Sequence, residues 1–354
     1  MSSKVFHVVG GGPGGVGAAY AAGKLGVKPI IYEAHGALAV KPCGRGVPLV
    51  GDLPFRVPGS VVLNRIRFIK LGVDGRWVFK AGGLIDGVIV DKGGFLEHVI
   101  AEAGGEVFYR ARYDVRRGLV RVGGEVLEVK GLGVFAGGFP YYEGVKAPVV
   151  QYVVGNARDV EEDTIEVMLD TRLLGYYYVF PQGDSFEVGV GGFASFNELQ
   201  ALLDKYMEKD PRLSGAKRVV REGAMISVGG LRLGYVNGLV KVGEAAGYVL
   251  PLTGEGIRPS ALSGYTAAKA LIEGSDPIRA LERAPISRAV RVQSSILDWV
   301  KTLSLEDRRY ILSNITPEAH AEVALGTLRL YRLIRGLKIK PSIALRIMAI
   351  VLRG

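Results

Sequence analysis

The sequence is poor in the residues that build disulfides and metal sites. It contains one cysteine, Cys43, so no disulfide can form within the chain, which fits a reducing cytoplasm. No cysteine and histidine cluster has the spacing of metal ligands. The histidines are scattered along the chain: His7, His35, His98 and His320. We therefore expect no metal site.

Long hydrophobic runs and a secretory signal are also missing. No apolar stretch reaches the roughly 20 residues that a membrane-spanning helix needs. Residues 1–10 lead directly into an apolar strand pattern, with neither a charged leader region nor a cleavage site. We therefore expect a cytoplasmic protein that is either soluble or peripheral on the inner face of the membrane.

Asparagine and glutamine are scarce as well, at five and four residues in 354. Such scarcity is typical of proteins from thermophiles. Lys and Arg number 45 against 35 Asp and Glu, for a formal net charge of +10. Three explanations for this charge remain open: a hyperthermophile's surface, contact with an anionic membrane, and nucleic acid. No nucleic-acid-binding motif supports the third, so we expect no nucleic-acid partner.

The length is sufficient for about two domains. Residues 4–34 have the pattern of a strand, a glycine-rich turn, a helix and a second strand. Residues 238–274 have the pattern of a strand, a glycine-rich loop and a helix. Between them, residues 61–90 alternate apolar and polar positions, with turn signals at Gly72, Gly75 and Gly82-Gly83, which predicts short antiparallel strands. Residues 149–193 are also rich in strand patterns, whereas the chain beyond about residue 277 is helical and basic.

The first chemical motif is the segment Gly10-Gly11-Gly12-Pro13-Gly14-Gly15, which follows a strand and opens a helix. Gly10 permits the tight turn, Gly12 lets the backbone approach a pyrophosphate, and Gly15 lets helix and strand pack closely. The helix N-terminus offers free N–H groups to the phosphates. Glu33, at the end of the next strand, can accept hydrogen bonds from ribose hydroxyls. This order of strand, glycine-rich loop, helix and acidic residue predicts dinucleotide binding.

A second motif identifies the dinucleotide. The segment from Val242 to Ala261 contains Gly243-Glu244-Ala-Ala-Gly, then Pro251, then Gly254-Glu-Gly256-Ile257. It resembles the G-D-A-A-G…P…G-x-G-I segment of p-hydroxybenzoate hydroxylase-like flavoproteins, with Glu244 in place of Asp. The resemblance implies that Glu244 contacts the ribitol of FAD. It also implies that the helix opened by Gly254, Gly256 and Ile257 points its N-terminus at the flavin ring and stabilises negative charge on it.

Further segments resemble the archaeal geranylgeranyl reductases. Lys41-Pro-Cys43-Gly44-Arg45-Gly46 is similar to their P-x-x-C-G-x-G segment, and Gly175–Gly183 to their Y-x-W-x-F-P-x-G signature, with Tyr178 for Trp. Val90–Phe95 is similar to their D-R-x-x-F segment, with Lys92 for Arg. The resemblance covers roughly residues 5–270. Together with the first motif, it predicts these cofactor-binding residues: Gly10, Gly12, Pro13, Gly14, Gly15, Glu33, Ala34, Cys43, Gly44, Arg45, Gly46, Lys92, Gly243, Glu244, Gly254, Gly256 and Ile257.

Four residues are candidates for catalysis. Cys43 is expected beside the flavin, either as a reactive thiol or as a small packing residue. Tyr176, Tyr178 and Phe180 alternate along a strand, which places them on one face. There they either line an apolar channel over the flavin or are ordinary aromatic residues of the sheet.

The resemblance implies a function, the reduction of isolated C=C bonds in polyprenyl chains, with the geranylgeranyl groups of archaeal ether lipids as substrate. No second dinucleotide motif is present, so the electrons are expected from a protein such as ferredoxin or from a transiently docked nicotinamide. Two alternatives remain open. One is a flavin-dependent monooxygenase or a quinone-linked oxidoreductase, and the other is a non-catalytic flavoprotein that binds a lipid or a protein partner.

We therefore predict an α/β fold in which a Rossmann-type FAD-binding domain holds an inserted antiparallel β-sheet substrate domain and is followed by a C-terminal helical segment. The discontinuous FAD-binding domain is predicted over residues 1–50, 85–140 and 235–280. The substrate domain is predicted over 51–84 and 141–234, and the helical region over 281–354.

The C-terminal segment is strongly basic. After residue 320 it contains one acidic residue, Glu322, and seven cations among apolar positions: Arg329, Arg332, Arg335, Lys338, Lys340, Arg346 and Arg353. Such helices can lie on an anionic bilayer. They can equally pack on the protein body with a solvated basic face, so the sequence leaves both interpretations open.

Overall fold

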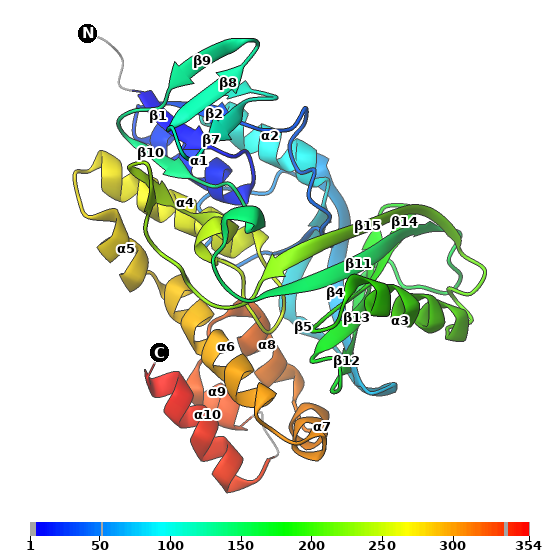
Figure 1. Cartoon of the computed structure of the whole chain (residues 1–354). Helices are drawn as coiled ribbons and strands as arrows, with labels where there is room; N and C mark the ends of the chain where they lie inside the picture. The colour runs from blue at the N-terminus through cyan, green and yellow to red at the C-terminus, as the bar shows by residue number, and fades with distance from the viewer. Residues whose placement is uncertain (1–4, 51, 336–338, 354) are drawn as a thin grey trace.

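The computed structural model describes residues 5–50, 52–335 and 339–353. Its elements form three parts: a nucleotide-binding layer at the top of Figure 1, a large sheet on the right and a group of helices below. This is the predicted α/β architecture with a helical C-terminal segment.

The nucleotide-binding layer is a six-stranded sheet in the order β16-β17-β10-β1-β2-β6. All neighbouring strands are parallel except β16 and β17. The strands are β1 (Val5–Val9), β2 (Lys28–Tyr32), β6 (Glu106–Phe108), β10 (Gly133–Phe135), β16 (Tyr235–Val236) and β17 (Leu239–Lys241). Its helices are α1 (Pro13–Lys24), α2 (Lys92–Glu102) and α4 (Ile257–Ile272). A small sheet of β7 (Arg112–Asp114), β8 (Leu119–Val122) and β9 (Glu125–Glu128) adjoins this layer (Figure 1).

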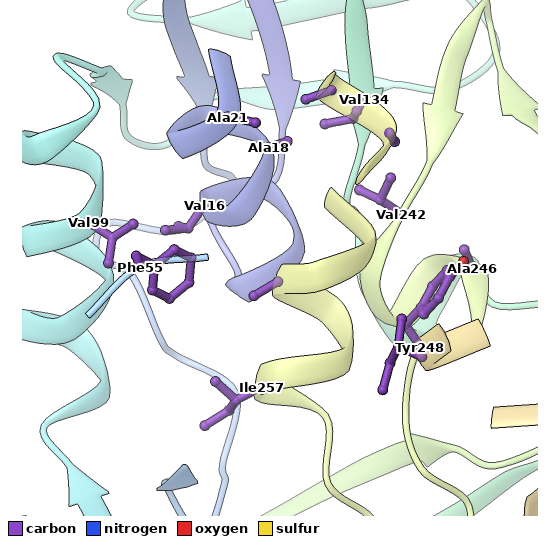
Figure 2. Packing of buried hydrophobic residues seen from close by; sticks show 14 of the residues in the cluster. Val16, Ala18, Ala21, Phe55, Val99, Val134, Val242, Ala246, Tyr248 and Ile257 are labelled. Carbon is purple, nitrogen blue, oxygen red and sulfur yellow. The ribbon is translucent and has the colours of Figure 1, made fainter. Parts of the chain in front are cut away.

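Helices α1 and α4 approach each other closely because small residues line their contact. A Cβ added at Gly17 would lie 2.1 Å from the Ala261 carbonyl oxygen, and one at Gly264 would lie 1.8 Å from that of Gly14. Figure 2 shows the two helices side by side, with Val16 and Ala18 on α1 and Ile257 at the start of α4. The contact therefore ties the first glycine motif to the second across about 240 residues of sequence.

The second sheet has eight strands in the order β15-β11-β14-β13-β12-β4-β5-β3. They are β3 (Gly46–Pro48), β4 (Val62–Val73), β5 (Arg76–Val90), β11 (Lys146–Gly155), β12 (Thr164–Asp170), β13 (Gly175–Gln182), β14 (Ser185–Gly191) and β15 (Lys217–Ser227). The expectation of a wholly antiparallel sheet is wrong at one pair, because β12 and β4 run parallel. Helix α3 (Phe196–Lys209) covers one face, capped by Ser195 and buried through Leu199 and Leu203.

The expectation of several short strands over residues 61–90 is also wrong. Only the turn at Asp74 and Gly75, both with positive φ, interrupts the chain. Gly72 and Gly82 lie where the register between the long strands β4 and β5 shifts. Such shifts bend a strand pair without ending either strand. As a result β5 continues to Val90, across the boundary that was predicted between residues 84 and 85.

The helical part follows α4 as α5 (Pro277–Arg283), α6 (Pro285–Lys301), α7 (Leu305–Ser313), α8 (Pro317–Leu325), α9 (Leu330–Arg335) and α10 (Pro341–Arg353). Short 3-10 turns are η1 (Gly59–Val61), η2 (Phe139–Tyr141) and η3 (Gly243–Ala246). Helix α8 packs against β5, and α10 packs against α6. Within the described residues, no helix is long and apolar enough to cross a membrane.

Candidate active site

One continuous cavity of about 950 Å³ lies between the three parts. At one end its walls are the glycine-rich loops of the nucleotide-binding layer. At the other end they are apolar side chains of the eight-stranded sheet and of helices α6 to α10, including Leu333 and Ile347. A cavity with a polar and an apolar end suits a cofactor and an apolar substrate that must meet.

The three glycines of the first motif have different surroundings. Gly10 has φ +101°, and a Cβ at Gly15 would lie 1.9 Å from the Gly10 carbonyl oxygen. A Cβ at Gly12 would meet no protein atom within 4 Å, and Gly12, Pro13 and Gly14 all line the cavity. Gly15 thus serves the contact between helix and strand, whereas the space in front of Gly12 is open to a ligand, as the motif predicts.

Glu33 lies beside this loop at the end of β2. Its carboxylate accepts hydrogen bonds from the Gly11 N–H at 2.8 Å and the His35 N–H at 2.9 Å, and it contacts the His35 Nδ1 at 2.6 Å. Glu33 and Ala34 both line the cavity. The carboxylate is therefore held in place by the backbone of both loops, where the ribose of a dinucleotide would meet it.

The second motif closes the same end of the cavity. Gly243 begins the turn η3, Gly254 has φ +71°, and Gly256 is the residue before α4 with no side-chain cap on that helix. In the first turn of α4 the Arg258 N–H donates to the Glu255 carboxylate at 3.3 Å and Pro259 has no N–H, so the positive end of the helix dipole meets the cavity through Ile257, which lines it. Both motifs together fit a bound flavin.

Glu244 is bound by two other groups in this structure. Its carboxylate pairs with the Lys41 ammonium at 2.5 Å and accepts the Ser227 N–H at 3.1 Å. Lys92 in turn donates to the Lys41 carbonyl oxygen at 3.0 Å. Glu244 and Lys92, both predicted to bind the cofactor, line the cavity. Lys41 lines it as well, although the predicted cofactor-binding residues did not include it.

The loop from Lys41 to Gly46 forms the boundary between the two ends of the cavity. Cys43 is half-buried, and its sulfur accepts the Arg45 N–H at 3.4 Å. Gly44 lies against Phe180, since a Cβ there would be 2.5 Å from the ring. Cys43, Gly44, Arg45 and Gly46 all line the cavity, so this segment comes together with both glycine motifs.

The three aromatic residues of β13 lie side by side on the cavity face. The ring centroids of Tyr176 and Tyr178 are 6.1 Å apart, and those of Tyr178 and Phe180 are 5.1 Å apart. Tyr177 points to the opposite face, where it stacks on Tyr206 of α3. The alternation along the strand thus separates a cavity wall from a packed core.

Both tyrosine hydroxyls on this wall already donate a hydrogen bond. The Tyr176 hydroxyl donates to the Thr253 carbonyl oxygen at 2.5 Å, and the Tyr178 hydroxyl donates to the Gln151 side-chain oxygen at 2.6 Å. Burial raises the pKa of Tyr176 to about 12, and it raises the pKa of Tyr178 well above its usual range. Both hydroxyls therefore stay protonated and point their protons away from a ligand.

A polar row continues from Tyr178 across the sheet. The Gln151 amide donates to Glu222 on β15 at 2.7 Å. Tyr178 can reach Gln151 only because Gly189 stands between them, since a Cβ at Gly189 would lie 2.3 Å from the Tyr178 ring. Sequence reasoning missed Gln151 and Glu222, because a strand pattern does not say which residues of other strands stand opposite.

Glu187 is a further residue that the sequence did not point to. It is almost fully buried on β14, and its carboxylate lies 3.4 Å from the Arg45 guanidinium. Burial raises its pKa to about 7, a shift that Arg45 opposes and nearby Glu222 reinforces. A second, polar cavity of about 210 Å³ adjoins these groups, and its lining includes Cys43, Arg45 and Glu222.

The apolar half of the cavity is built from residues far apart in the sequence. The sheet contributes Ile66, Ile69, Leu71, Ile165, Val167 and Leu169, and the helices contribute Ile296, Trp299, Ile311, Ile315 and Val323. No motif pointed to these residues, because isolated apolar positions occur throughout the chain. They form an apolar channel, and Val167, which pairs with Tyr178 in the sheet, joins this channel to the aromatic wall.

Comparisons with known proteins agree with this geometry. No family model matches the chain. The chain is 27% identical over 313 residues to the digeranylgeranylglycerophospholipid reductase of Thermoplasma acidophilum, an alignment that covers 76% of this chain and 78% of the relative. It is 26% identical over 367 aligned positions to the chloroplastic geranylgeranyl diphosphate reductase of Oryza sativa subsp. japonica, over 89% of this chain and 77% of the relative.

Solved structures show the same fold. A crystal structure of a geranylgeranyl bacteriochlorophyll reductase-like protein from Thermoplasma acidophilum superposes with a TM-score of 0.76 at 23% identity, over 92% of this chain and 96% of that chain. A flavoprotein/dehydrogenase from Cytophaga hutchinsonii superposes with a TM-score of 0.67 at 14% identity, over 98% and 99%. These likenesses show that the chain shares the fold of both structures.

Proposed function

We propose that this chain is a member of the geranylgeranyl reductase family of flavin-dependent oxidoreductases and that it uses FAD to saturate isolated C=C bonds in polyprenyl chains. The proposed substrate class is the geranylgeranyl groups of archaeal ether lipids. The observation that carries the proposal is the continuous cavity, which joins both glycine motifs to an apolar channel. A monooxygenase or a non-catalytic flavoprotein is not favoured by the relatives, which are named reductases.

The choice of FAD over a shorter flavin rests on the adenosine end of the site. The open space at Gly12 suits a pyrophosphate, and the Glu33 carboxylate suits the ribose beyond it. A flavin mononucleotide would leave both positions unused. FAD should therefore be the flavin released from the purified protein by heat.

The proposed reaction needs a dry pocket and a proton. An isolated alkene has no carbonyl to take up negative charge, so a proton must arrive with or before the hydride. When bound and reduced, the flavin supplies that hydride. Tyr176, Tyr178 and Phe180 present aromatic faces that can stabilise the positive charge that develops on the alkene, and the apolar channel excludes water.

We propose the Cys43 thiol as the proton donor. The hydroxyls of Tyr176 and Tyr178 donate elsewhere, whereas the Cys43 sulfur accepts one backbone N–H and its thiol donates to no acceptor among the described residues. The adjoining polar cavity also touches Cys43, so water there can return the proton to the thiolate after each turnover.

The electron donor is proposed to be a ferredoxin-like protein or a transiently docked nicotinamide. The sequence contains no second glycine-rich dinucleotide unit that would hold a nicotinamide permanently. A stopped-flow comparison of reduced ferredoxin, NADH and NADPH, following loss of flavin absorbance under anaerobic conditions, would distinguish the donors.

The proposed function is tested by product mass. The protein with bound FAD is reduced anaerobically with dithionite and incubated with a geranylgeranyl ether lipid, and the lipid is analysed by mass spectrometry. Gain of one H2 for each bond reduced is the expected result. Gain of an oxygen atom after exposure to air, or an unchanged lipid beside a flavin that does become reduced, would contradict the proposal.

We further propose a peripheral location at an anionic membrane surface, through helices α9 and α10. Ile347 and Val351 are buried against the body, whereas Leu345 and Leu352 are exposed beside the described cations of this region. Arg332 is partly neutralised by Glu322, at 3.3 Å. The side chain of Arg335, and Lys338, lie outside the described residues.

Sedimentation with liposomes tests this location. Binding should be stronger to anionic than to zwitterionic vesicles and should weaken as salt rises. The double substitution Lys340→Glu and Arg346→Glu should reduce it and leave the bound flavin unchanged. Substitution is preferable to truncation because α9 and α10 supply Leu333 and Ile347 to the cavity wall. Equal binding to both kinds of vesicle would count against the proposal.

A further inference from the structure

One polar ring lies in the apolar half of the cavity. His320, on α8, lines the cavity together with Ile315 and Val323, and its ring packs edge-on against Phe79 of β5 with centroids 5.9 Å apart. Burial lowers the pKa of the imidazole to about 4, so the ring is neutral near neutral pH. A neutral imidazole offers one N–H donor and one nitrogen acceptor.

The imidazole has no hydrogen-bond partner within the part of the chain that the structure describes. Its backbone N–H donates to the Thr316 carbonyl oxygen at 2.9 Å, as the helix requires, and this bond leaves the ring nitrogens unused. The side chain is partly accessible from the cavity, so an apolar ligand that fills the cavity would leave the imidazole without a partner, at a cost in free energy that leucine or phenylalanine would not incur. The unpartnered nitrogens therefore point to a ligand that enters the cavity with a hydrogen-bonding atom.

The sheet sets the offset between His320 and the aromatic wall. Phe79 stands opposite Leu71, Leu71 opposite Val167, and Val167 opposite Tyr178. Three strand steps separate Phe79 from Tyr178, or about 14 Å at the usual strand spacing. The intervening side chains of Leu71 and Val167 are apolar and line the cavity, so the space between the two ends suits a hydrocarbon chain.

The cationic side chains that line the cavity lie at its cofactor end. Among the described residues that line it, the Lys and Arg side chains are Lys41, Arg45 and Lys92, and these belong to the loop and helix at the cofactor end. A diphosphate near His320 would therefore be buried without a lysine or arginine to compensate it, which is strongly unfavourable. An uncharged oxygen would gain a hydrogen bond there without that penalty.

We propose that His320 is the anchor for an uncharged oxygen of the substrate, a hydroxyl, ether or carbonyl group at the end of a prenyl chain. This inference rests on the proposed function and names the substrate class within it. The anchor holds one end of the chain about three strands from Tyr178. It thereby selects which C=C bond along the chain lies at the aromatic wall.

Ligand binding can be followed without turnover. Trp299 lines the same cavity, and the only other tryptophan is Trp77, so the variant Trp77→Phe leaves Trp299 as the sole indole. In this background, with FAD bound and oxidised, three probes of equal chain length are titrated and the Trp299 emission is recorded. The probes are geranylgeraniol, the corresponding oxygen-free tetraene hydrocarbon, and geranylgeranyl diphosphate.

The expected result is a preference that depends on His320. The parent protein should bind geranylgeraniol about tenfold or more tightly than the hydrocarbon, and both more tightly than the diphosphate. His320→Leu should weaken binding of the alcohol about tenfold and leave the hydrocarbon unaffected or bound more tightly. His320→Gln, which can still donate and accept, should recover part of the loss. Val323→Leu, a change of volume on the same wall, should not alter the ratio of alcohol to hydrocarbon.

Two results would overturn the anchor. An unchanged ratio of alcohol to hydrocarbon in His320→Leu would show that His320 does not contact the oxygen, while reduction of prenyl chains could still proceed. Tightest binding of the diphosphate would show that the site accepts a charged end. Failure of all three probes to bind the parent protein would overturn the proposed function together with the anchor, so the two failures are distinguishable.

Discussion

The two ends of the cavity are built by different means. At the cofactor end, short contiguous segments supply backbone groups and glycines, and the chain conformation itself makes the site. At the channel end, single side chains from strands and helices meet across long sequence separations, and Leu71, Val167 and His320 share no motif. The first end therefore depends on local geometry, and the second depends on strand register and helix packing.

The two ends also differ in how they treat charge. The cofactor end pairs its ions, as Lys41 does with Glu244 and Arg45 with Glu187. The channel end buries His320 with no ionic partner among the described residues, and burial accordingly lowers its pKa to about 4. Substitutions at the two ends should therefore separate loss of cofactor from loss of substrate.

The largest effect is expected for Gly12→Val at the cofactor end. The new side chain would meet no protein atom near its Cβ, so the fold should be retained, but it would occupy the path of a pyrophosphate. FAD affinity should fall by at least about 100-fold, in line with the loss of several charge-assisted hydrogen bonds. The measurement is flavin content after purification, together with the melting curve of the cofactor-free protein.

Gly15→Ala is the matched control for that substitution. Its Cβ would lie 1.9 Å from the Gly10 carbonyl oxygen, so the fold itself should be destabilised. A Gly12→Val protein that retains stoichiometric FAD would refute the assignment of this loop.

Val167→Trp should block the channel and leave the cofactor end intact. Val167 lies next to Tyr178 in the sheet and lines the cavity, so a larger side chain fills space that the prenyl chain needs. Turnover should fall about tenfold or more, because forcing extra volume into a filled site costs free energy. Flavin content and reduction of the flavin by dithionite should stay unchanged. Val219→Trp, at an exposed position of β15, should leave turnover unaltered. Equal turnover in both variants would show that the substrate does not pass Val167.

Acidification should destabilise the protein through His320. The folded-state pKa of about 4 lies below the unfolded value near 6.5, so between these pH values the unfolded chain binds a proton that the folded chain does not. Stability is therefore lost as the pH falls through this window, by up to about 3 kcal/mol.

The measurement is the difference in unfolding free energy between the native protein and His320→Leu across that pH range. The raised pKa of Glu187 acts in the opposite sense, because stability from its protonated form is lost as the pH rises toward 7. Glu187 is common to both proteins and cancels in the difference. Parallel pH curves would mean that His320 is solvated inside the cavity.

Gln151→Leu should cost about 1–3 kcal/mol of stability, because it leaves the Tyr178 hydroxyl buried without a partner. Tyr178→Phe should remove most of that penalty, so the double variant should lose less than the sum of the single losses. Denaturant unfolding of the four proteins measures this coupling. If the losses of unfolding free energy in the two single variants add up to the loss in the double variant, Tyr178 and Gln151 are not energetically coupled.

Cys43→Ser should have the smallest structural effect. Serine keeps the size of the side chain and is a weaker acid than a thiol, so FAD should remain bound and reducible while turnover falls. The flavin spectrum and single-turnover rates provide the measurement. Turnover equal to that of the native protein, with an unchanged spectrum, would mean that Cys43 only packs.

Much of the cofactor end could be predicted from sequence. The roles expected for Gly10, Gly12 and Gly15 agree with their surroundings, because a tight turn and a helix start are local events that depend on neighbouring residues. The alternation of Tyr176, Tyr178 and Phe180 also predicted one shared face, since the period of a strand is independent of its partners.

Predictions that required strand pairing did worse. The glycines at 72 and 82 suggested strand ends, but the partner strands absorb them as register shifts. The parallel pairing of β12 with β4 was not anticipated either, because pairing direction depends on the route of the chain.

By itself, the sequence determined that the chain has the loops of a flavin site and an alternating aromatic strand, because these are properties of neighbouring residues. Only the tertiary structure decided that Gly189 leaves room for Tyr178 to reach Gln151, that Cys43 lines the same cavity as Tyr178, and that His320 enters the channel with no side-chain partner among the described residues. Each of these is a contact between elements distant in the chain. Such contacts are set by register and packing, which no local pattern encodes.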